Sequence, residues 1–492
     1  MPTSLALLTD LYQLTMAYGY WKSKLTHRRA AFHAYFRNNP FQGGFTLACG
    51  LSPFIDYLRN FIFAPDDLAY LATLTADDNT PLFDNAFLDY LGNLRLTCDV
   101  DAIPEGTPVF PHEPLVRVTG PLLECQLLET PLLNLVNFAS LAATKAARVC
   151  LAARGQPVLE FGLRRAQGPD GAMTASRAAY IGGCHATSNV LAGKRFGIPV
   201  KGTHAHSWVM CFDSELESFH AYADAMPNNC VFLVDSYNTL DGVRHAIDVG
   251  KELRASGCRL LGIRLDSGDL AYLSIEARKL LDAAGFPDAQ ILASNDLDEH
   301  IIDSLKDQNA AIDAWGVGTK LVTAFDQPAL GGIYKLSAVQ NAAGQWQHKI
   351  KLSEQRAKIS IPGVLQVRRF HSGESGGQIL GDMIFDTLTS PSHPDGFRGD
   401  RTIIDPLDPI RRKLIPDNAT YEDLLVPIFK NGELVYSPPA LPAIREHARR
   451  QIAALHPGIT RNVNPHAYPV GLEKHLDDLR NHLILQLRGL PE

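Results

Sequence analysis

The chain has 492 residues, of which 46% are hydrophobic and 20% charged, and its formal net charge is −7 at pH 7. This length predicts two or three domains, and the composition excludes disordered, collagen-like and coiled-coil chains. The slightly acidic balance excludes a global basic surface for nonspecific binding to nucleic acid or to an anionic membrane. Any anionic ligand must therefore be bound by local groups.

The cysteines and the N-terminal sequence point to a cellular location. The eight cysteines lie far apart and form no CxxC pair, which favours reduced thiols over a disulfide framework. The opening sequence MPTSLALLTDLY has no basic segment before its apolar run, and no stretch approaches the roughly 18 apolar residues of a membrane helix. We therefore expect a cytoplasmic protein with no membrane-spanning segment and no nucleic-acid partner.

Residues 1–140 mix helical stretches with short strands separated by proline and glycine, which predicts an α+β domain. Within it, residues 104–122 alternate apolar and polar side chains between prolines, as antiparallel strands do. The segment 127–153 is long, apolar and rich in alanine. It is typical of a buried helix that connects two domains.

Residues 141–340 show a different pattern, in which a short apolar run that ends in polar residues is followed by a helical stretch, and the pattern then repeats. These runs are 157–165, 198–207, 230–238, 260–269, 290–296 and 312–320, with 333–339 as a further candidate. Helices are expected at Asp241–Ser256 and Leu270–Ala284, each followed by a glycine that ends it. Such alternation predicts right-handed βαβ units and a parallel sheet. Six or seven units favour an irregular, incomplete (β/α) barrel.

Beyond the barrel, residues 341–440 contain expected strands, which we interpret as a return to the flanking α+β domain built from the N- and C-terminal segments. Residues 441–492 form an expected helical tail, with helices at 443–455 and 472–487. The second helix carries a leucine stripe at positions 472, 476, 479, 483 and 487, typical of core packing or of a dimer contact.

Barrel active sites are built at the carboxyl ends of the strands, so the residues that end each run are the candidates for chemistry. They are Arg164, Arg165, Thr203, His204, His206, Asp235, Arg264, Asp266, Asp269, Asn295, Asp296, Gly316, Gly318 and Thr319. Singly, each could be a helix cap or a surface ion-pair partner. Their succession at six expected strand ends predicts a site.

The residue types at these ends favour a polyanionic ligand. Arginine forks bind phosphate or carboxylate oxygens, and the sequence GVGT (316–319) exposes backbone N–H groups before an expected helix. Asp235, Asp266 and Asp269 could hold Mg²⁺ or pair with sugar hydroxyls. No GxxxxGK[ST] sequence is present, so a P-loop ATPase is not supported.

His204 and His206 leave three interpretations open. An HxH pair on a strand begins the metal site of many barrel hydrolases, but the later expected strand ends supply no further histidine. Alternatively, one histidine is a nucleophile toward phosphate, oriented by a carboxylate such as Asp235. A Schiff-base aldolase acting through Lys201 or Lys320 is the third interpretation.

Eight segments in register carry a family resemblance. They are LLTDLYQLTMAYGYW (7–21), FGLRRAQGPDG (161–171), ATSNVLAG (186–193), GTHAHSW (202–208), LVDSYNT (233–239), GIRLDSGDL (262–270), GVGTKLVT (316–323) and GGIYKL (331–336). Together they resemble the nicotinate phosphoribosyltransferase family of type II phosphoribosyltransferases over about residues 7–370.

The resemblance implies an α/β protein with an incomplete (β/α) barrel and a flanking α+β domain, forming a homodimer with shared active sites. It implies that nicotinate and phosphoribosyl pyrophosphate (PRPP) give nicotinate mononucleotide and pyrophosphate, as the first step of NAD salvage from nicotinate. ATP is the co-substrate, hydrolysed to ADP and phosphate through a phosphohistidine, and Mg²⁺ is the cofactor. Nicotinamide phosphoribosyltransferase is the alternative enzyme with this fold, and the motif sequences GLRRAQGPDG and GTHAHS argue against it.

The same resemblance implies roles for individual residues. His206 is the phosphorylated residue, whereas His204 stands where the family has an apolar residue. The residues implied to act in catalysis are His206, Asp235, Arg264 and Asp266, with Mg²⁺ held through Asp235 and Asp266. The residues implied to bind substrate are Tyr12, Arg164, Arg165, Thr203, Arg264, Asn295, Gly318 and Thr319, with Tyr12 reaching the pyridine ring, from the partner subunit in the family's dimer.

Overall fold

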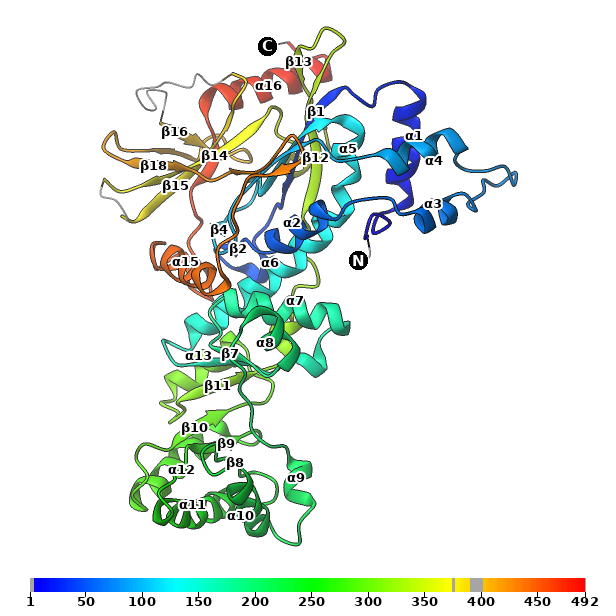
Figure 1. Ribbon diagram of the computed structural model, residues 1–492. Coiled ribbons are helices and arrows are strands. Elements are labelled where there is room, and N and C mark those ends of the chain that lie inside the picture. Colours follow the sequence, from blue (N-terminus) through cyan, green and yellow to red (C-terminus); the bar gives the residue numbers. More distant parts are fainter. Residues whose placement is uncertain (1–3, 374–376, 390–400, 492) are drawn as a thin grey trace. The chain divides into compact units, whose positions relative to one another are not determined.

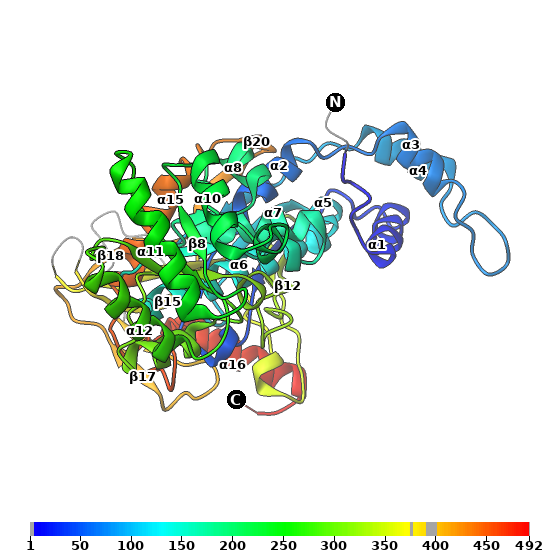
Figure 2. The same ribbon diagram turned by 90° about the horizontal axis from the view of Figure 1, so that it is seen from below.

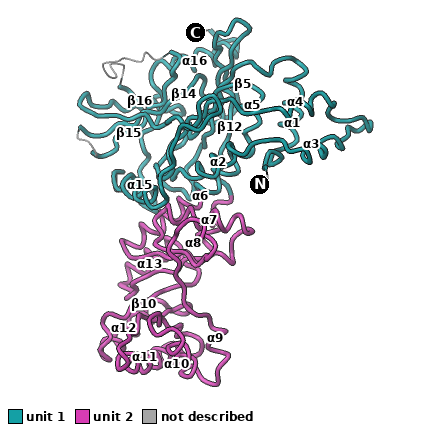
Figure 3. Tube along the Cα trace, in the orientation of Figure 1, with its two compact units in different colours: residues 1–140, 329–492 teal, residues 141–328 magenta. Residues whose placement is uncertain are grey.

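The computed structural model describes residues 4–373, 377–389 and 401–491. The chain divides into two compact units (Figure 3). One unit comprises residues 1–140 and 329–492, and the other comprises residues 141–328. The chain thus enters the second unit at residue 141 and leaves it at residue 328.

The unit formed by residues 141–328 contains a six-stranded sheet in which every pair of neighbouring strands is parallel. In spatial order the strands are β7 (Ala186–Thr187), β6 (Val158–Glu160), β11 (Ala314–Val317), β10 (Gln290–Ala293), β9 (Gly262–Leu265) and β8 (Val231–Leu233). The described residues leave β7 and β8 as edges, so hydrogen bonds do not close the sheet. This is the expected incomplete (β/α) barrel.

Helices follow the strands of this unit, as Figure 1 shows. They are α7 (Gly168–Ile181), α8 (Val190–Phe196), α9 (His206–Met210), α10 (Glu215–Ala225), α11 (Thr239–Ala255), α12 (Leu270–Ala283), α13 (Glu299–Asp307) and α14 (Thr319–Val322), with the 3-10 turn η2 (Leu163–Arg165). Asn238 and Asp269 cap α11 and α12 by accepting backbone N–H groups of the first turn. Gly257 and Gly285, both at positive φ, end the same helices as the sequence predicted.

Two expected strands are corrected by the structure. Residues 198–207 do not form a strand; they contribute a single parallel bridge, from Val200 to Thr187 of β7. The segment 333–339 is not a seventh barrel strand, because β12 (Ile333–Gln340) pairs with β1 (Arg29–Tyr35) in the other unit. Both errors concern which strand pairs with which, and that depends on contacts distant in sequence.

The helix α6 (Glu129–Ala152) contains the expected buried connecting segment. It is long and apolar enough to cross a membrane by length and composition, but most of it is buried in the protein, as in a core helix. Its Lys145 and Arg148 are buried and pair with the buried Glu299 of α13 at 2.7 and 2.8 Å. A buried carboxylate between two cations fixes α13, and with it the loop that follows β10.

The unit formed by residues 1–140 and 329–492 contains two larger sheets and a two-stranded one. The first has the order β13 (Trp346–His348), β12, β1, β5 (Val116–Pro121), β3 (Asp99–Ala102), β19 (Val426–Lys430) and β20 (Glu433–Leu434). The second has the order β17 (Arg412–Leu414), β16 (Thr402–Ile404), β21 (Val470–Leu472), β15 (Ile379–Asp386), β14 (Leu365–His371) and β18 (Thr420–Asp423). The third pairs β2 (Thr46–Leu47) with β4 (Pro108–Val109).

The helices of this unit come from both ends of the chain. They are α1 (Leu11–Lys22), α2 (Leu51–Arg59), α3 (Pro65–Leu71), α4 (Asn85–Asn93), α5 (Leu122–Leu127), α15 (Leu441–Ala453) and α16 (Lys474–Arg488), with 3-10 turns η1 (Pro40–Gln42) and η3 (Arg356–Lys358). Figures 1 and 2 both show α1, α3 and α4 gathered at one edge of the unit. The expected C-terminal helices are present as α15 and α16, and α16 packs against β15 and β16.

N- and C-terminal segments are interleaved in this unit. Strand β1 lies between β5 and β12, and β3 lies between β5 and β19, so both ends of the chain share one sheet. In the second sheet, the fully buried Arg369 binds the fully buried Asp382, which also accepts a hydrogen bond from Tyr468 at 2.7 Å. The flanking α+β domain built from two chain segments is thus confirmed.

Candidate active site

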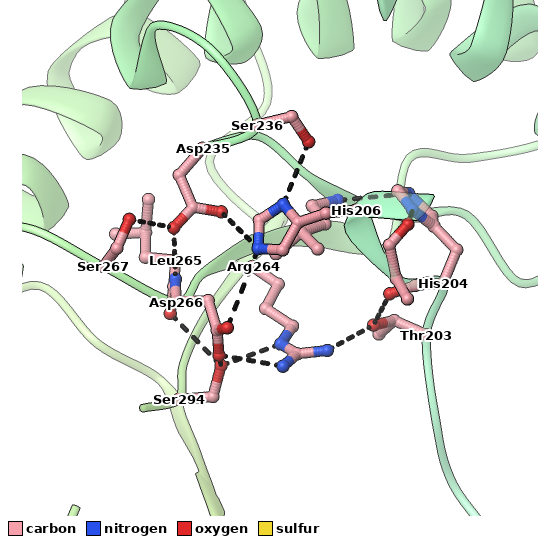
Figure 4. A network of polar contacts seen from close by, with 12 residues as sticks. Thr203, His204, His206, Asp235, Ser236, Arg264, Leu265, Asp266, Ser267 and Ser294 are labelled. Atoms are coloured by element: carbon pink, nitrogen blue, oxygen red, sulfur yellow. Dashed lines mark hydrogen bonds and ion pairs between the residues drawn. The ribbon is translucent and has the colours of Figure 1, made fainter. Parts of the chain in front are cut away.

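The carboxyl ends of β8, β9 and β10 converge with residues 203–206 in one polar cluster (Figure 4). Asp235 and Ser236 follow β8, Asp266 and Ser267 follow β9, and Ser294 follows β10. Neighbouring parallel strands bring their carboxyl ends to one edge of the sheet, and for that reason residues far apart in sequence meet there. We call this group the strand-end cluster.

His206 begins α9, and both of its ring nitrogens face groups of the strand-end cluster. Its Nδ1 forms a 3.0 Å hydrogen bond with Oγ of Ser236. Its Nε2 lies 3.9 Å from Oδ1 of Asp235 and 3.8 Å from Oδ2 of Asp266. The ring remains 40% exposed, so a ligand can reach it. The structure therefore places His206 beside the carboxylate that the sequence proposed as its orienting partner.

One carboxylate oxygen of Asp235 accepts two hydrogen bonds, whereas the other accepts none among the described residues. Its Oδ2 accepts hydrogen bonds from the backbone N–H of Asp266 at 2.9 Å and from Oγ of Ser267 at 2.6 Å. Its Oδ1 is buried and has no hydrogen-bond partner among the described residues. An unpartnered buried carboxylate oxygen is costly unless a cation or donor meets it, and Nε2 of His206 lies 3.9 Å from this one.

Arg264 lies at the centre of the cluster and is held by three side chains. Its Nε donates to Oγ of Ser294 at 2.8 Å, Nη1 donates to Oγ1 of Thr203 at 3.2 Å, and Nη2 donates to Oδ1 of Asp266 at 2.9 Å. The guanidinium carbon also lies 5.7 Å from the centre of the Phe161 ring. A mostly buried cation fixed at this many points is suited to recognising an anion of defined geometry.

Asp266 keeps its charge despite partial burial. Burial alone would raise the pKa of its carboxyl, but the Ser294 hydroxyl and the Arg264 guanidinium outweigh this and hold the pKa below its ordinary value. The Ser294 hydroxyl donates to Oδ1 of Asp266. Asp266 is therefore a carboxylate at neutral pH, with Oδ2 turned toward His206.

His204 does not face the same side as His206. Its Nε2 accepts a hydrogen bond from the backbone N–H of Leu233 at 3.2 Å, and its ring packs among Phe219, Tyr222 and Phe232. Burial lowers the pKa of His204 to about 4, so the ring is neutral. The two histidines diverge because residues 203–205 are not a strand. His204 is thus a packing and hydrogen-bonding residue, and the HxH metal pair is not supported.

A pocket of about 260 Å³ opens beside Arg264. Its lining comprises Phe161, Leu163, Arg164, Ser188, Gly202, Thr203, His204, Ala205 and Arg264. Arg164 is exposed on η2 and lines the pocket, whereas the adjacent Arg165 is exposed but is not part of that lining. The pocket therefore combines an aromatic wall with two arginines, and this suits a small planar anion.

The loop after β11 borders the same edge of the sheet. Gly316 lies against Phe161, where a Cβ atom would come within 2.7 Å of the ring, so only glycine allows this approach. Gly318 and the half-buried Thr319 follow, and Lys320 pairs with Asp298 at 2.6 Å. Asn295 ends the neighbouring strand β10 at positive φ. The loop is thus joined by an ion pair to Asp298, the residue that caps α13.

Four further predicted residues have other positions. Asp269 caps α12 and is not part of the strand-end cluster. Tyr12 lies on α1 in the other unit, 47% exposed, and its contact with substrate stays a prediction. Lys320 is paired with Asp298, and Lys201 is exposed, so neither offers the desolvated amine of a Schiff-base aldolase.

Sequence reasoning missed the residues that support the predicted ones. Ser236, Ser267 and Ser294 bind the charged groups of the cluster, and Phe161 forms the aromatic wall. Serine is common at strand ends and has no distinctive spacing, so only the position of each directly after or beside a predicted charged residue could have indicated it.

Metal binding can be tested on the donor set. Among the described residues, no group of three or more His, Cys, Asp and Glu side chains is placed to hold a metal ion. Asp235 and Asp266 nevertheless offer two carboxylate oxygens near His206, one of them unpartnered. This set fits Mg²⁺ only when substrate phosphates and water supply the remaining oxygens, the usual arrangement for that ion.

An incomplete parallel barrel with a histidine, two carboxylates and arginines at its carboxyl edge, beside an α+β unit, is the architecture of a type II phosphoribosyltransferase. Family models for the nicotinate phosphoribosyltransferase N-terminal domain, family region and C-terminal domain match residues 7–137, 157–351 and 366–480. The chain belongs to the nicotinate phosphoribosyltransferase family.

Individual relatives agree. The chain is 44% identical to nicotinate phosphoribosyltransferase of Bacillus subtilis over 96% of this chain and 93% of the relative. It is 36% identical to the human enzyme of the same name, over 97% and 96%. The crystal structure of human nicotinic acid phosphoribosyltransferase superposes with a TM-score of 0.82 at 34% identity, covering 96% of this chain and 99% of that chain. Neither nicotinamide phosphoribosyltransferase nor a barrel metallohydrolase is supported.

Proposed function

We propose that the protein converts nicotinate, PRPP, ATP and water to nicotinate mononucleotide, pyrophosphate, ADP and phosphate, with ATP hydrolysis coupled through phosphorylated His206. The observation that carries this proposal is the environment of His206, whose Nδ1 is bound by Ser236 while Nε2 is exposed between Asp235 and Asp266. Family membership supports nicotinate as the pyridine substrate.

Arg264 binds the nicotinate carboxylate in this proposal. Of the five N–H groups of a guanidinium, three are used by Ser294, Thr203 and Asp266. One N–H remains on each terminal nitrogen, which gives Arg264 two donors for the two oxygens of a carboxylate. Phe161 supplies an aromatic face for the pyridine ring. Nicotinamide has no negative charge for this fork, so nicotinate is preferred.

PRPP binds along the strand ends. The backbone N–H groups of Gly318 and Thr319 donate hydrogen bonds to its 5-phosphate. The helix that follows, α14, has four residues and is too short for a sizeable dipole, so these hydrogen bonds supply the binding. Asn295 faces the ribose, and Arg164, with Arg165 beside it, binds pyrophosphate. Departure of pyrophosphate from C1 of the ribose builds positive charge on the sugar and negative charge on the leaving group, which these groups stabilise. The pyridine nitrogen then forms the new bond to C1.

Mg²⁺ would be held by Asp235 and Asp266 together with substrate phosphate oxygens, where it supplies electrostatic stabilisation of phosphate charge. The Oδ1 atom of Asp235, buried and without a hydrogen-bond partner among the described residues, is suited to meet such a cation.

Phosphorylation of His206 uses its Nε2 lone pair. The hydrogen bond between Nδ1 and Ser236 orients the ring. In the tautomer that carries its proton on Nδ1, the lone pair of Nε2 is free to attack the γ-phosphate of ATP. The bond from Nε2 to phosphorus forms as the bond to ADP breaks. Water later takes the phosphoryl group from Nε2, restoring the histidine and releasing phosphate. Synthesis of the nucleotide is thus driven by ATP hydrolysis.

A homodimer with shared active sites is part of the proposal. Leu5, Leu8, Leu11, Tyr12 and Met16 expose apolar surface on and before α1, with exposed fractions of 37% to 53%. A second copy that covers this surface could present Tyr12 to the pyridine ring bound by its partner. The cysteine pattern supports the cytoplasm as the location.

The direct test is product formation, measured by mass-resolved chromatography with purified protein, Mg²⁺, PRPP and either nicotinate or nicotinamide, each with and without ATP. We expect nicotinate mononucleotide, formed faster with ATP, and no product from nicotinamide. Product from nicotinamide alone would refute the role of Arg264, and no ATP effect with nicotinate would refute the coupling through His206.

A further inference from the structure

Ser294 connects two functional groups of the strand-end cluster with one hydroxyl (Figure 4). It follows β10 directly and is 3% exposed. Its Oγ accepts the 2.8 Å hydrogen bond from Nε of Arg264 and donates to Oδ1 of Asp266. Arg264 and Asp266 also bind each other, so the three side chains form a closed ring of hydrogen bonds.

The backbone fixes where this hydroxyl lies. The N–H of Ser294 donates to the carbonyl of Leu265 at 2.8 Å, which continues the pairing of β10 with β9 beyond Ala293. Leu265 stands between Arg264 and Asp266 in the sequence. Pairing within the sheet therefore holds the backbone of Ser294 level with these two residues.

The hydroxyl contacts Arg264 at Nε, the nitrogen that joins the guanidinium group to the aliphatic part of the side chain. A contact at Nε uses none of the N–H groups on the terminal nitrogens, and each terminal nitrogen keeps one N–H beyond those given to Thr203 and Asp266. An arginine side chain has several rotatable bonds, and an unheld fork loses more conformational freedom when it binds an anion. A fixed contact at Nε removes part of that cost before the substrate arrives.

We propose that Ser294 is a positioning residue for substrate selection, which aligns the Arg264 guanidinium with the carboxylate of a pyridine carboxylic acid. Its hydrogen bond to Asp266 fixes that alignment relative to the Asp266 carboxylate. This inference rests on the proposed function, because it assigns Arg264 to the nicotinate carboxylate. Ser294 itself touches no substrate and acts through Arg264.

The test compares steady-state kinetics of the unsubstituted protein with Ser294→Ala. We expect KM for nicotinate to rise about tenfold, as for loss of one hydrogen bond to a charged group, while KM for PRPP changes less than about twofold. Selectivity for nicotinate over nicotinamide should fall by a similar factor. Ser274→Ala is the matched control: Ser274 is also fully buried and hydrogen-bonded, on α12, and its loss should leave both KM values unchanged.

A double-mutant cycle separates positioning from a general structural effect. In an Arg264→Lys background the group that Ser294 positions is gone, so adding Ser294→Ala should not raise the nicotinate KM further. A nicotinate KM for Ser294→Ala within about twofold of the unsubstituted protein would overturn the inference, as would a full additional increase in the Arg264→Lys background. Failure of the unsubstituted protein to form nicotinate mononucleotide would instead refute the proposed function itself.

Discussion

The Nε2 atom of His206 lies 3.9 Å from Oδ1 of Asp235, a buried carboxylate oxygen with no hydrogen-bond partner among the described residues. The other oxygen of Asp235 is fixed by the backbone of Asp266 and by Ser267. The carboxylate therefore cannot turn away from the histidine. The negative charge of Asp235 favours a cation near Nε2, such as the metal ion that accompanies a phosphoryl group. Asp235 is therefore an informative residue to change.

Asp235→Asn should uncouple ATP hydrolysis from nucleotide synthesis. The amide oxygen can still accept from Asp266 and Ser267, so the fold is kept, but the amide nitrogen then faces Nε2 of His206 and can donate a hydrogen bond to it. We expect the ATP-stimulated rate to fall by about 10²-fold, with the ATP-independent rate nearly unchanged. Parallel assays of nicotinate mononucleotide and ADP check this. Retained stoichiometric ADP release would show that Asp235 is not needed for coupling.

Arg264→Lys should reduce selectivity for nicotinate. A lysine ammonium keeps the charge but cannot bind Thr203, Ser294 and a substrate carboxylate together with fixed geometry. We expect kcat/KM for nicotinate to fall by about 10²-fold, with a smaller effect on KM for PRPP. Arg244→Lys, an exposed change on α11 where the arginine pairs with Asp241, is the control and should behave as the unsubstituted protein. Equal losses for both variants would contradict the assignment.

His204 makes the stability of its unit sensitive to acid. The ring has a pKa of about 4 in the folded protein and an ordinary value near 6.5 when unfolded. As the pH falls, the unfolded chain therefore binds the proton before the folded protein does. The contribution of neutral His204 to the free energy of unfolding is complete above pH 6.5 and falls by about 3 kcal/mol at most as the pH approaches 4. His204→Gln can still accept from Leu233 but does not titrate.

The measurement for this prediction is the urea midpoint between pH 7 and pH 4. The His204→Gln variant should lose less stability over that range than the unsubstituted protein. His220→Gln, which changes a half-buried histidine that pairs with Glu252 on the same unit, should not reduce the loss. Parallel pH curves for His204→Gln and the unsubstituted protein would show that His204 is not the titrating group.

Glu299→Gln should destabilise the barrel unit. The substitution removes the charge that faces Lys145 and Arg148 in the interior of the protein. Loss of one partner from a buried ion pair typically costs about 3–5 kcal/mol. Scanning calorimetry should show a clear fall in melting temperature. Glu276→Gln breaks only an exposed pair with Lys279 and should cost less than about 1 kcal/mol, so similar effects of the two changes would refute the role assigned to the buried triad.

The periodic part of the sequence predicted most of the barrel. Apolar runs ending in polar residues became β6, β8, β9, β10 and β11, because each run is short and followed by a helix. The helices after β8, β9 and β10 also carry side-chain caps. The shortest strand, β7, has two residues and shows no period, so it was missed. Strand β12 has the composition of a barrel strand, and only its pairing with β1 places it in the other unit.

The charged residues of the site were predicted, but their support was not. Asp235, Arg264 and Asp266 end recognisable strands, so their proximity follows from the parallel sheet. Ser294 carries no such signal, because a buried serine after a strand is ordinary until its partners are known. The two histidines at 204 and 206 were expected to face alike; their divergence reflects an irregular backbone that the sequence pattern did not reveal.

The central claim is that His206 carries a phosphoryl group from ATP, and labelling tests it most directly. Protein incubated with Mg²⁺ and ATP labelled at the γ-phosphate should acquire an acid-labile, base-stable phosphate on the peptide containing His206, bonded at Nε2. His206→Ala should remain unlabelled while retaining slow, ATP-independent formation of nicotinate mononucleotide. Label on another residue, or ATP-stimulated synthesis that persists in His206→Ala, would contradict the account.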